Sequence, residues 1–201
     1  MNIRFVYLLF FFSQVINSQN SVRNSLNEIK KGYEMIYEFP SLTNDGGWEG
    51  SYTLKSYYDH VSDASYRFKN AIDQFEKIKS EIEIVDNFNF NCINDSYRKQ
   101  EVINLKNKLL QLKSSLSYEI DGIYELLDGF SYIESRLYAM YKDGNRRYNK
   151  MAINEIKEYY PTLMKRIGNY SNAIVNKFNN TDYYKMNVTE TINSIKLRNC
   201  N

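Results

Sequence analysis

A helical spacing of apolar residues, repeated along most of the chain, is the feature that most constrains the fold. In each such stretch an apolar side chain returns every three or four positions, so one face of an α-helix becomes apolar. No stretch shows the strict alternation typical of a half-buried strand. The sequence therefore predicts an all-α bundle of about five amphipathic helices, two or three of them long. Their expected ranges are 21–38, 52–85, 147–178 and 184–197, and the third helix has an apolar series from Val102 to Leu137 and ends at the segment KDGNRR, residues 142–147.

Proline and glycine residues interrupt these stretches. Pro40 ends the first helix, and the loop after it carries Trp48, the only tryptophan, which we expect to pack into the core. Gly122 and Gly129 lie inside the third stretch, where each costs about 1 kcal/mol against alanine, so we expect a bend or break there. Pro161 leaves two alternatives open, a kinked fourth helix or a new helix with this proline in its first turn.

Two parts of the chain are similar to each other. Residues 28–39 align without gaps on residues 119–130, and each half of the chain then ends in an Asn-Cys pair. Two degenerate helical repeats, 21–92 and 97–200, would explain the similarity. A chance match between amphipathic helices of biased composition is the alternative.

The first residues follow the three-part pattern of a secretory signal peptide: a positive charge at Arg4, an apolar run, and then small and polar residues. Residues 1–18 are the expected signal peptide, and residues 19–201 the expected single all-helical domain; an uncleaved signal anchor is the alternative. No later stretch approaches the roughly 20 consecutive apolar residues of a membrane span. The sequence therefore predicts a secreted, extracellular protein without a membrane anchor.

Charge is balanced along the chain. There are 26 Lys and Arg against 24 Asp and Glu, and the two signs alternate through most segments. Such a chain attracts neither nucleic acid nor anionic lipid strongly, so no nucleic-acid partner is expected. Tyrosine is frequent, with 19 residues. An aromatic binding surface is one explanation, and an AT-rich coding bias is the other.

No residue pattern indicates catalysis. His60 is the only histidine, and it lies between Asp59 and Asp63 on the polar face of its helix. A nucleophile–base system or a zinc site would depend on this one imidazole. Neither cysteine has metal-ligand spacing, and no glycine-rich phosphate loop occurs. We therefore expect no catalytic, cofactor-binding or metal-binding residue and classify the chain as a non-enzyme. An enzyme that uses carboxylates alone is a weaker alternative.

The two cysteines, Cys92 and Cys200, are expected to form a disulfide. Pairing is the default state of thiols in an oxidising compartment. The bridge would join the loop after the second helix to the end of the last one, with Phe88 and Phe90 covering the core. An intermolecular bridge and free thiols are the alternatives.

Four Asn-x-Ser/Thr sequons are candidates for N-glycosylation, although a chain this rich in Asn and Ser reaches about that number by chance. Two of them, at Asn94 and Asn179, fall in expected loops and are the favoured acceptors. The other two are at Asn169 and Asn187.

A signal peptide, a tyrosine-rich helical chain and two halves that each close near a cysteine resemble the bicycle proteins, which are secreted effectors of gall-forming aphids. Those proteins are recognised by paired Cys-Tyr-Cys motifs, whereas this chain has Asn-Cys-Ile-Asn-Asp and Asn-Cys-Asn. The resemblance therefore covers the architecture and not the defining residues. It implies injection from salivary glands into plant tissue, and it assigns no functional residue.

The leading functional hypothesis is a secreted, non-enzymatic helical protein that acts through protein–protein interaction. Its expected partner is a protein of unknown identity, either of a host or extracellular, and the sequence predicts no oligomeric state. The alternative is an extracellular carrier whose helices enclose a lipid or another small hydrophobic ligand.

Overall fold

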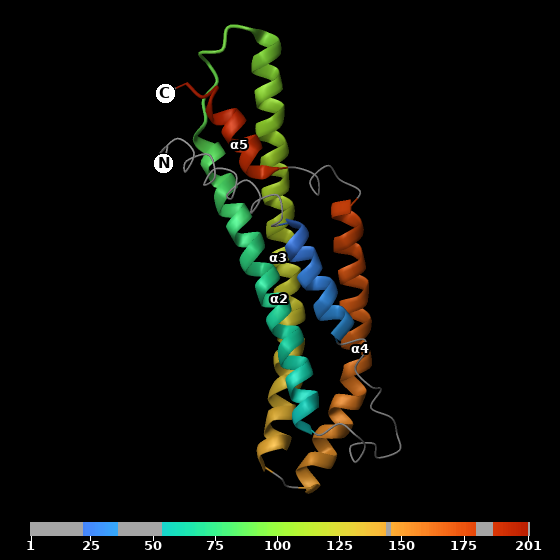
Figure 1. Ribbon diagram of the computed structural model, residues 1–201. Coiled ribbons are helices and arrows are strands. Elements are labelled where there is room, and N and C mark those ends of the chain that lie inside the picture. Colours follow the sequence, from blue (N-terminus) through green and yellow to red (C-terminus); the bar gives the residue numbers. More distant parts are fainter. Residues whose placement is uncertain (1–21, 36–53, 144–145, 180–186, 201) are drawn as a thin grey trace, which may run out of the picture. The chain divides into compact units, whose positions relative to one another are not determined.

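Helices form all the regular structure in the part of the chain that the computed structural model describes, which comprises residues 22–35, 54–143, 146–179 and 187–200. This confirms the predicted all-α fold (Figure 1). The predicted signal peptide, residues 1–18, and Trp48 lie outside the described residues. The elements are a helix at residues 22–35, α2 (Leu54–Glu83), the short 3-10 helix η2 (Ile84–Asn87), α3 (Ser96–Asp143), α4 (Arg146–Asn179) and α5 (Val188–Lys196).

The chain divides into two compact units, each built from separate stretches of sequence. Unit 1 contains the described residues 22–25, 72–120, 177–179 and 187–200, and unit 2 contains residues 26–35, 54–71, 121–143 and 146–176. Helices α2, α3 and α4 each contribute one part to each unit. The predicted repeats do not coincide with these units, because each unit takes residues from both halves, and the duplication stays a prediction.

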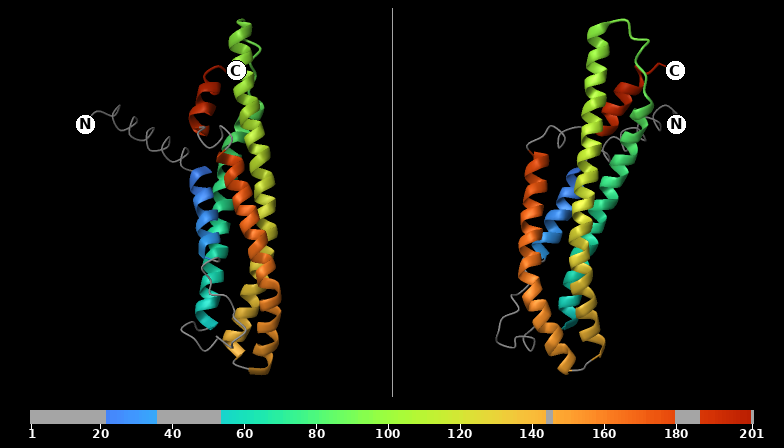
Figure 2. Two further views of the ribbon diagram at one scale, coloured as in Figure 1. Left: turned by 90° about the vertical axis from the view of Figure 1, so that its right-hand side faces the viewer. Right: turned by 180° about the vertical axis from the view of Figure 1, so that it is seen from behind.

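The core of unit 2 forms where four helical segments meet. Residues 26–35 lie beside α2 and α4 in the views of Figures 1 and 2. The rings of Phe68 and Phe130 are 5.4 Å apart and join α2 to α3. Ser65 is also buried, although it interrupts the apolar spacing. The other buried apolar residues of this core include Ile29, Val61, Ala64, Ile123, Ile133, Leu137, Leu163, Ile167 and Ile174.

Of the predicted bend or break in the third helix, the break is not observed, because α3 runs without interruption through 48 residues; the bend stays a prediction. The two glycines of α3 serve close packing against α4. A Cβ on Gly122 would overlap the phenol of Tyr170, and a Cβ on Gly129 would lie 2.7 Å from Leu163 Cδ1. Helix α4 is also continuous, with Pro161 inside it, so the alternative of a new helix at this proline is not observed.

The core of unit 1 joins the end of α2, the first half of α3 and α5. The rings of Phe75 and Phe178 stack with centroids 6.0 Å apart. Helix α5 packs against η2, and its apolar residues Val188, Ile192 and Ile195 are buried. Helix α5 starts at Val188, four residues after the predicted start, because the Asn187 side chain caps it by accepting a hydrogen bond from the Glu190 backbone amide. Other buried residues of this core are Ile78, Ile82, Val85, Phe90, Val102, Leu109, Leu112 and Leu116.

Candidate interaction surface

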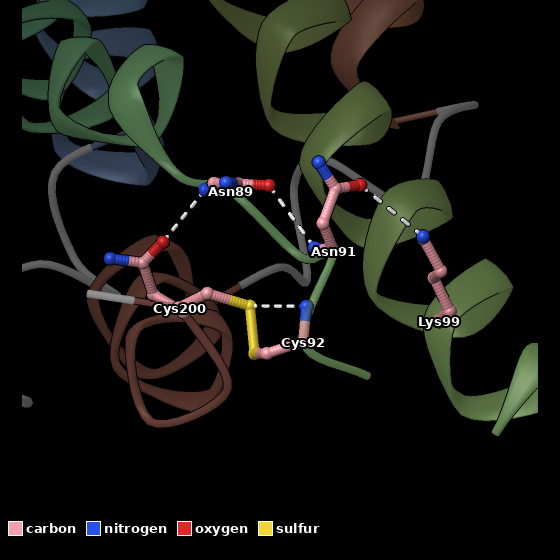
Figure 3. The surroundings of a disulfide bond; sticks show 6 residues. Asn89, Asn91, Cys92, Lys99 and Cys200 are labelled. Carbon is pink, nitrogen blue, oxygen red and sulfur yellow. Dashed lines mark hydrogen bonds between the residues drawn. A yellow bond between two sulfur atoms is a disulfide. The ribbon is translucent and has the colours of Figure 1, made fainter. Parts of the chain in front are cut away.

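The structure joins Cys92 to Cys200 by a disulfide, with the two Cα atoms 5.7 Å apart (Figure 3). Backbone hydrogen bonds hold the same two segments together. The Cys200 amide donates to the Asn89 carbonyl over 2.7 Å, and the Asn89 amide donates to Asn199 Oδ1 over 2.7 Å. Both thiols are therefore used as a structural link. Phe90 is buried beneath this loop and Phe88 is half-buried, as the sequence predicts.

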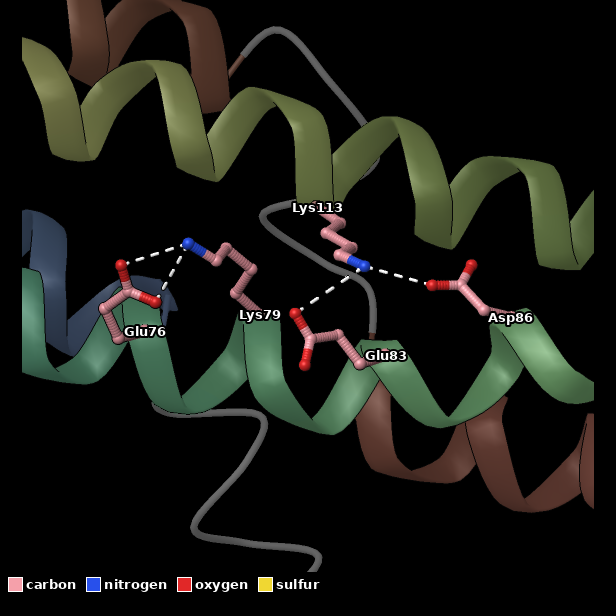
Figure 4. A network of polar contacts seen from close by, with 5 residues as sticks. All are labelled: Glu76, Lys79, Glu83, Asp86 and Lys113. Carbon is pink, nitrogen blue, oxygen red and sulfur yellow. Dashed lines mark hydrogen bonds and ion pairs between the residues drawn. The ribbon is translucent and has the colours of Figure 1, made fainter.

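A cationic side chain on α3 ties that helix to η2 within unit 1. Lys113 Nζ lies 3.0 Å from Asp86 Oδ2 and 3.7 Å from Glu83 Oε1 (Figure 4). The hydrogen bond to Asp86 raises the pKa of Lys113 above its ordinary value. One turn before Glu83, Lys79 pairs with Glu76 inside α2 over 3.0 Å, and this pair shares no residue with the two ion pairs of Lys113. Lys113 thus links α3 to the end of α2 and to η2, and the Lys79–Glu76 pair lies within α2.

An open hollow of about 340 Å³ lies between α3 and α4 within unit 2. Gly129 has no side chain to fill it, and the Tyr159 hydroxyl comes within 3.2 Å of the place that a Cβ would take. We call this hollow the α3–α4 groove. It is lined by Glu125, Asp128, Gly129, Tyr132, Tyr159 and Arg166.

The two tyrosines of the groove contact each other, and Tyr132 also contacts charged neighbours. Their rings meet edge to face, with centroids 5.4 Å apart. The Tyr132 hydroxyl donates to Glu155 Oε2 over 3.2 Å, and Arg136 pairs with the same oxygen over 3.1 Å. The Arg136 guanidinium also lies 5.5 Å from the centre of the Tyr132 ring. Tyr132 therefore keeps its orientation although it is exposed to solvent.

The charges of the groove are only partly paired. Arg166 lies 3.8 Å from Glu125, and their side chains are 52% and 76% exposed, so this ion pair is weak. Asp128 is exposed and has no ion pair with any residue that the structure describes. The groove thus presents a carboxylate beside two ordered aromatic rings.

A second open hollow, of about 290 Å³, also belongs to unit 2. It is lined by Tyr58, Ser131, Glu134, Ser135 and Tyr138. The rings of Tyr58 and Tyr138 are 5.6 Å apart. Both hollows are open to solvent and hold only about 290 and 340 Å³, so neither encloses a ligand as the predicted alternative of a lipid carrier requires.

The structure places the four sequons in different environments. Asn94 is exposed in the loop before α3, two residues after Cys92, and Asn169 is exposed on α4. Asn187 is half-buried and caps α5. Asn179 is the last residue of α4, and its side chain lies outside the described residues.

His60 is half-buried in α2, next to half-buried Asp59 and one turn before exposed Asp63. No group of histidine, cysteine, aspartate or glutamate side chains in the described ranges is arranged to hold a metal ion. None of the helices described here is both long enough and apolar enough to cross a membrane.

The chain matches no family model, no curated protein and no solved structure. The fold itself therefore defines the class, an all-α helical bundle with one disulfide.

Sequence reasoning did not find the α3–α4 groove. Its α3 residues lie three or four positions apart, a spacing that places Glu125, Asp128 and Tyr132 on one face of a helix. That signal was present in the sequence. The facing residues on α4, Tyr159 and Arg166, follow more than 25 residues later, and no periodicity in the sequence pairs them with α3.

Proposed function

We propose that this chain is a secreted, non-enzymatic protein that acts through protein–protein interaction on a host or extracellular partner. The α3–α4 groove is the observation that carries the proposal. Tyrosine and arginine are enriched among the residues that dominate binding energy in protein interfaces. A tyrosine held by neighbouring contacts, as Tyr132 is, loses little conformational entropy when a partner binds.

The chemistry of the groove favours a basic side chain of the partner. Asp128 supplies a carboxylate that has no ion pair among the described residues, and rings such as those of Tyr132 and Tyr159 attract a cation that approaches their faces. A hollow of about 340 Å³ accommodates an anchoring side chain and not a whole domain. A Lys or Arg side chain of the partner would enter the α3–α4 groove, and the surfaces around the groove would contact the surrounding surface of the partner.

The disulfide supports export, because such bonds persist mainly in oxidising compartments. The predicted signal peptide supports it independently. Expression of the full chain in a secreting eukaryotic cell, followed by N-terminal sequencing of protein from the medium, tests this part of the proposal. A mature chain that begins near Gln19 is expected, and retention of the whole chain inside the cell would contradict export.

A pull-down with matched variants tests the interaction. The wild-type chain and Asp128→Lys are each used to capture protein from candidate host extracts, and captured proteins are identified by mass spectrometry. Asp73→Lys is the control, because Asp73 is an exposed aspartate on α2 that also has no ion pair among the described residues. We expect one protein to bind the wild type and Asp73→Lys, with at least tenfold less bound to Asp128→Lys.

Equal capture by Asp128→Lys and Asp73→Lys would show that the groove is not the binding site. Native mass spectrometry of the same preparations tests the alternative hypothesis that the protein carries a small hydrophobic ligand. A retained small apolar ligand together with no specifically captured protein would reverse the order of the two hypotheses.

A further inference from the structure

Helix α5 is the shortest α-helix in the part of the chain that the structure describes. It has 9 residues, and isolated helices below roughly 12–15 residues are marginal in water. Its apolar residues Val188, Ile192 and Ile195 are buried, and the helix packs against η2. The contacts that keep α5 on the rest of unit 1 therefore decide whether it remains helical.

The polar contacts between α5 and its neighbours lie at the surface. The Thr189 hydroxyl donates to Glu81 Oε2 over 3.2 Å in an exposed position. Just after the helix, Arg198 pairs with Glu101 over 3.6 Å, and the two side chains are 42% and 54% exposed. Exposed ion pairs contribute little to stability. The Cys92–Cys200 disulfide is the only covalent link that adds to these contacts.

The segment beneath α5 is fastened to α3 without the help of α5. Lys106 Nζ donates to the carbonyl of Asp86 over 3.1 Å and to that of Phe88 over 3.2 Å. Lys113 forms an ion pair with the Asp86 carboxylate. None of these contacts involves a sulfur atom or a residue of α5. When α5 leaves, η2 therefore stays on α3, and the surface of η2 against which α5 packs becomes open to solvent.

The disulfide itself is accessible to a reductant. Cys92 is exposed, and Cys200 is half-buried. The Cys92 amide donates a hydrogen bond to Cys200 Sγ over 2.8 Å (Figure 3). When a thiolate attacks the exposed Cys92 sulfur, Cys200 is the leaving thiolate, and this amide stabilises the charge that forms on it. A stabilised leaving thiolate makes thiol–disulfide exchange faster.

We propose that α5 is a redox-sensitive switch: reduction of the Cys92–Cys200 bridge releases α5 and uncovers the apolar surface at η2, while α2, α3 and α4 remain folded. The reductant is a dithiol. Its first thiolate forms a bond with Cys92 Sγ, the bond between the two cysteines breaks, and the electron pair leaves on Cys200 Sγ. The second thiolate of the reductant then displaces Cys92 from the mixed disulfide. The reductant is oxidised to a disulfide, and its two thiol protons pass to the two cysteines.

The switch would respond to the compartment in which the protein lies. Disulfides persist in oxidising compartments, whereas glutathione and thioredoxin keep thiols reduced inside cells. Helix α5 therefore stays docked in an extracellular protein, and entry into a reducing cell interior would release it. The switch belongs to unit 1 and the α3–α4 groove to unit 2, so the inference does not depend on the proposed binding site.

Hydrogen exchange of the full chain, measured by mass spectrometry with and without dithiothreitol, tests the switch. Alkylation of both thiols confirms that reduction is complete. We expect the amides of residues 188–196 to exchange about tenfold faster or more after reduction, because the helix then opens locally. The amides of residues 105–120 in α3 should keep their protection. Removal of dithiothreitol and reoxidation should restore slow exchange in α5.

The Cys92→Ser, Cys200→Ser double variant is the control. Its α5 amides should exchange fast, and dithiothreitol should have no effect on them. Unchanged exchange of α5 in the fully reduced wild type would overturn the proposal, because the noncovalent contacts would then suffice. Loss of protection in α2, α3 and α5 together would also overturn it, because the bridge would then hold the whole of unit 1 and not α5 alone.

Discussion

Lys177 Nζ lies 2.7 Å from Glu119 Oε1, and the Glu119 side chain is only 3% exposed. The pair joins α4 to α3 within unit 1. Lys177 itself is 41% exposed, and its amine also lies 5.1 Å from the centre of the Tyr118 ring. The buried Glu119 carboxylate is therefore paired with the ammonium group of Lys177, whose side chain is partly exposed to solvent.

Removal of this cation should destabilise the fold. In Lys177→Met the buried Glu119 carboxylate loses this ion pair, and breaking a fully buried ion pair costs about 3–5 kcal/mol. Because Lys177 is partly exposed, we expect a smaller loss, about 2 kcal/mol in the free energy of unfolding. Urea denaturation followed by circular dichroism measures it.

Glu119→Gln is the informative counterpart, since it removes the buried charge and leaves Lys177 in contact with water. We expect it to cost less than Lys177→Met, and we expect the double variant to be more stable than Lys177→Met alone. If Lys177→Met unfolds at the wild-type urea concentration, the ion pair contributes nothing measurable.

The disulfide should supply a large share of the stability. It closes a loop with a sequence separation of 108 residues. The chain-entropy model gives nearly 5 kcal/mol for such a loop, and measured bridges more often give about 2–4 kcal/mol. We expect the Cys92→Ser, Cys200→Ser double variant to lose about 2–4 kcal/mol of unfolding free energy in urea. An unchanged denaturation midpoint would mean that the bridge constrains little.

Gly122→Ala should destabilise the protein although alanine is the better helix former. The exchange gains about 1 kcal/mol of helix propensity, but the new Cβ overlaps the Tyr170 ring, and such overpacking costs about 1–3 kcal/mol. We expect a net loss of about 1 kcal/mol, measured by thermal denaturation. In a Tyr170→Ala background the same substitution should become neutral or stabilising. Equal losses in both backgrounds would exclude the steric explanation.

The free energy of unfolding should decrease at alkaline pH, because Lys113 then loses its proton and its charge. Its hydrogen bond to Asp86 raises the pKa of Lys113 in the folded protein above the ordinary value of 10.5. The contribution to stability is therefore complete below pH 10.5 and is lost as the pH rises through the raised pKa. We expect Lys113→Met to be less stable than the wild type at pH 8, with the difference shrinking above pH 10.5.

Lys108→Met is the control for this pH series, because Lys108 is exposed on the same helix and has no charged partner among the described residues. Its unfolding curve should follow that of the wild type at every pH. A difference between Lys113→Met and wild type that stays constant up to the highest pH would contradict the assignment.

Helix positions were predictable because they depend on local spacing. The series ending at Val85 predicted a helix over 52–85, and the structure has α2 and η2 over Leu54–Asn87. The disulfide was predictable because only two cysteines exist to be paired. The hydrogen bonds of Asn89 hold the same two segments together, and no spacing rule in the sequence indicates them.

The absence of a break at the glycines of α3 has a different cause. Helix propensity describes an isolated helix, which Gly122 would destabilise relative to alanine. In the folded protein, Gly122 has no side chain, and this leaves room for Tyr170 of α4. Tertiary packing therefore makes glycine favourable at a position where helix propensity alone disfavours it. The burial of Glu119 was unpredictable for the same reason, because its partner Lys177 lies 58 residues further along the chain. The α3–α4 groove likewise depends on contacts between separate helices.

The disulfide also changes what proteolysis can do to this molecule. Between Cys92 and Cys200 the backbone and the sulfur bridge together form a closed covalent ring. A single cut anywhere inside that ring opens it without releasing a fragment, so the nicked protein keeps its mass, apart from one added water, until a reductant is present. A cut before Cys92 lies outside the ring and divides the chain into two pieces with no covalent link between them. A protease would therefore give different products on a non-reducing gel according to which side of Cys92 it cuts.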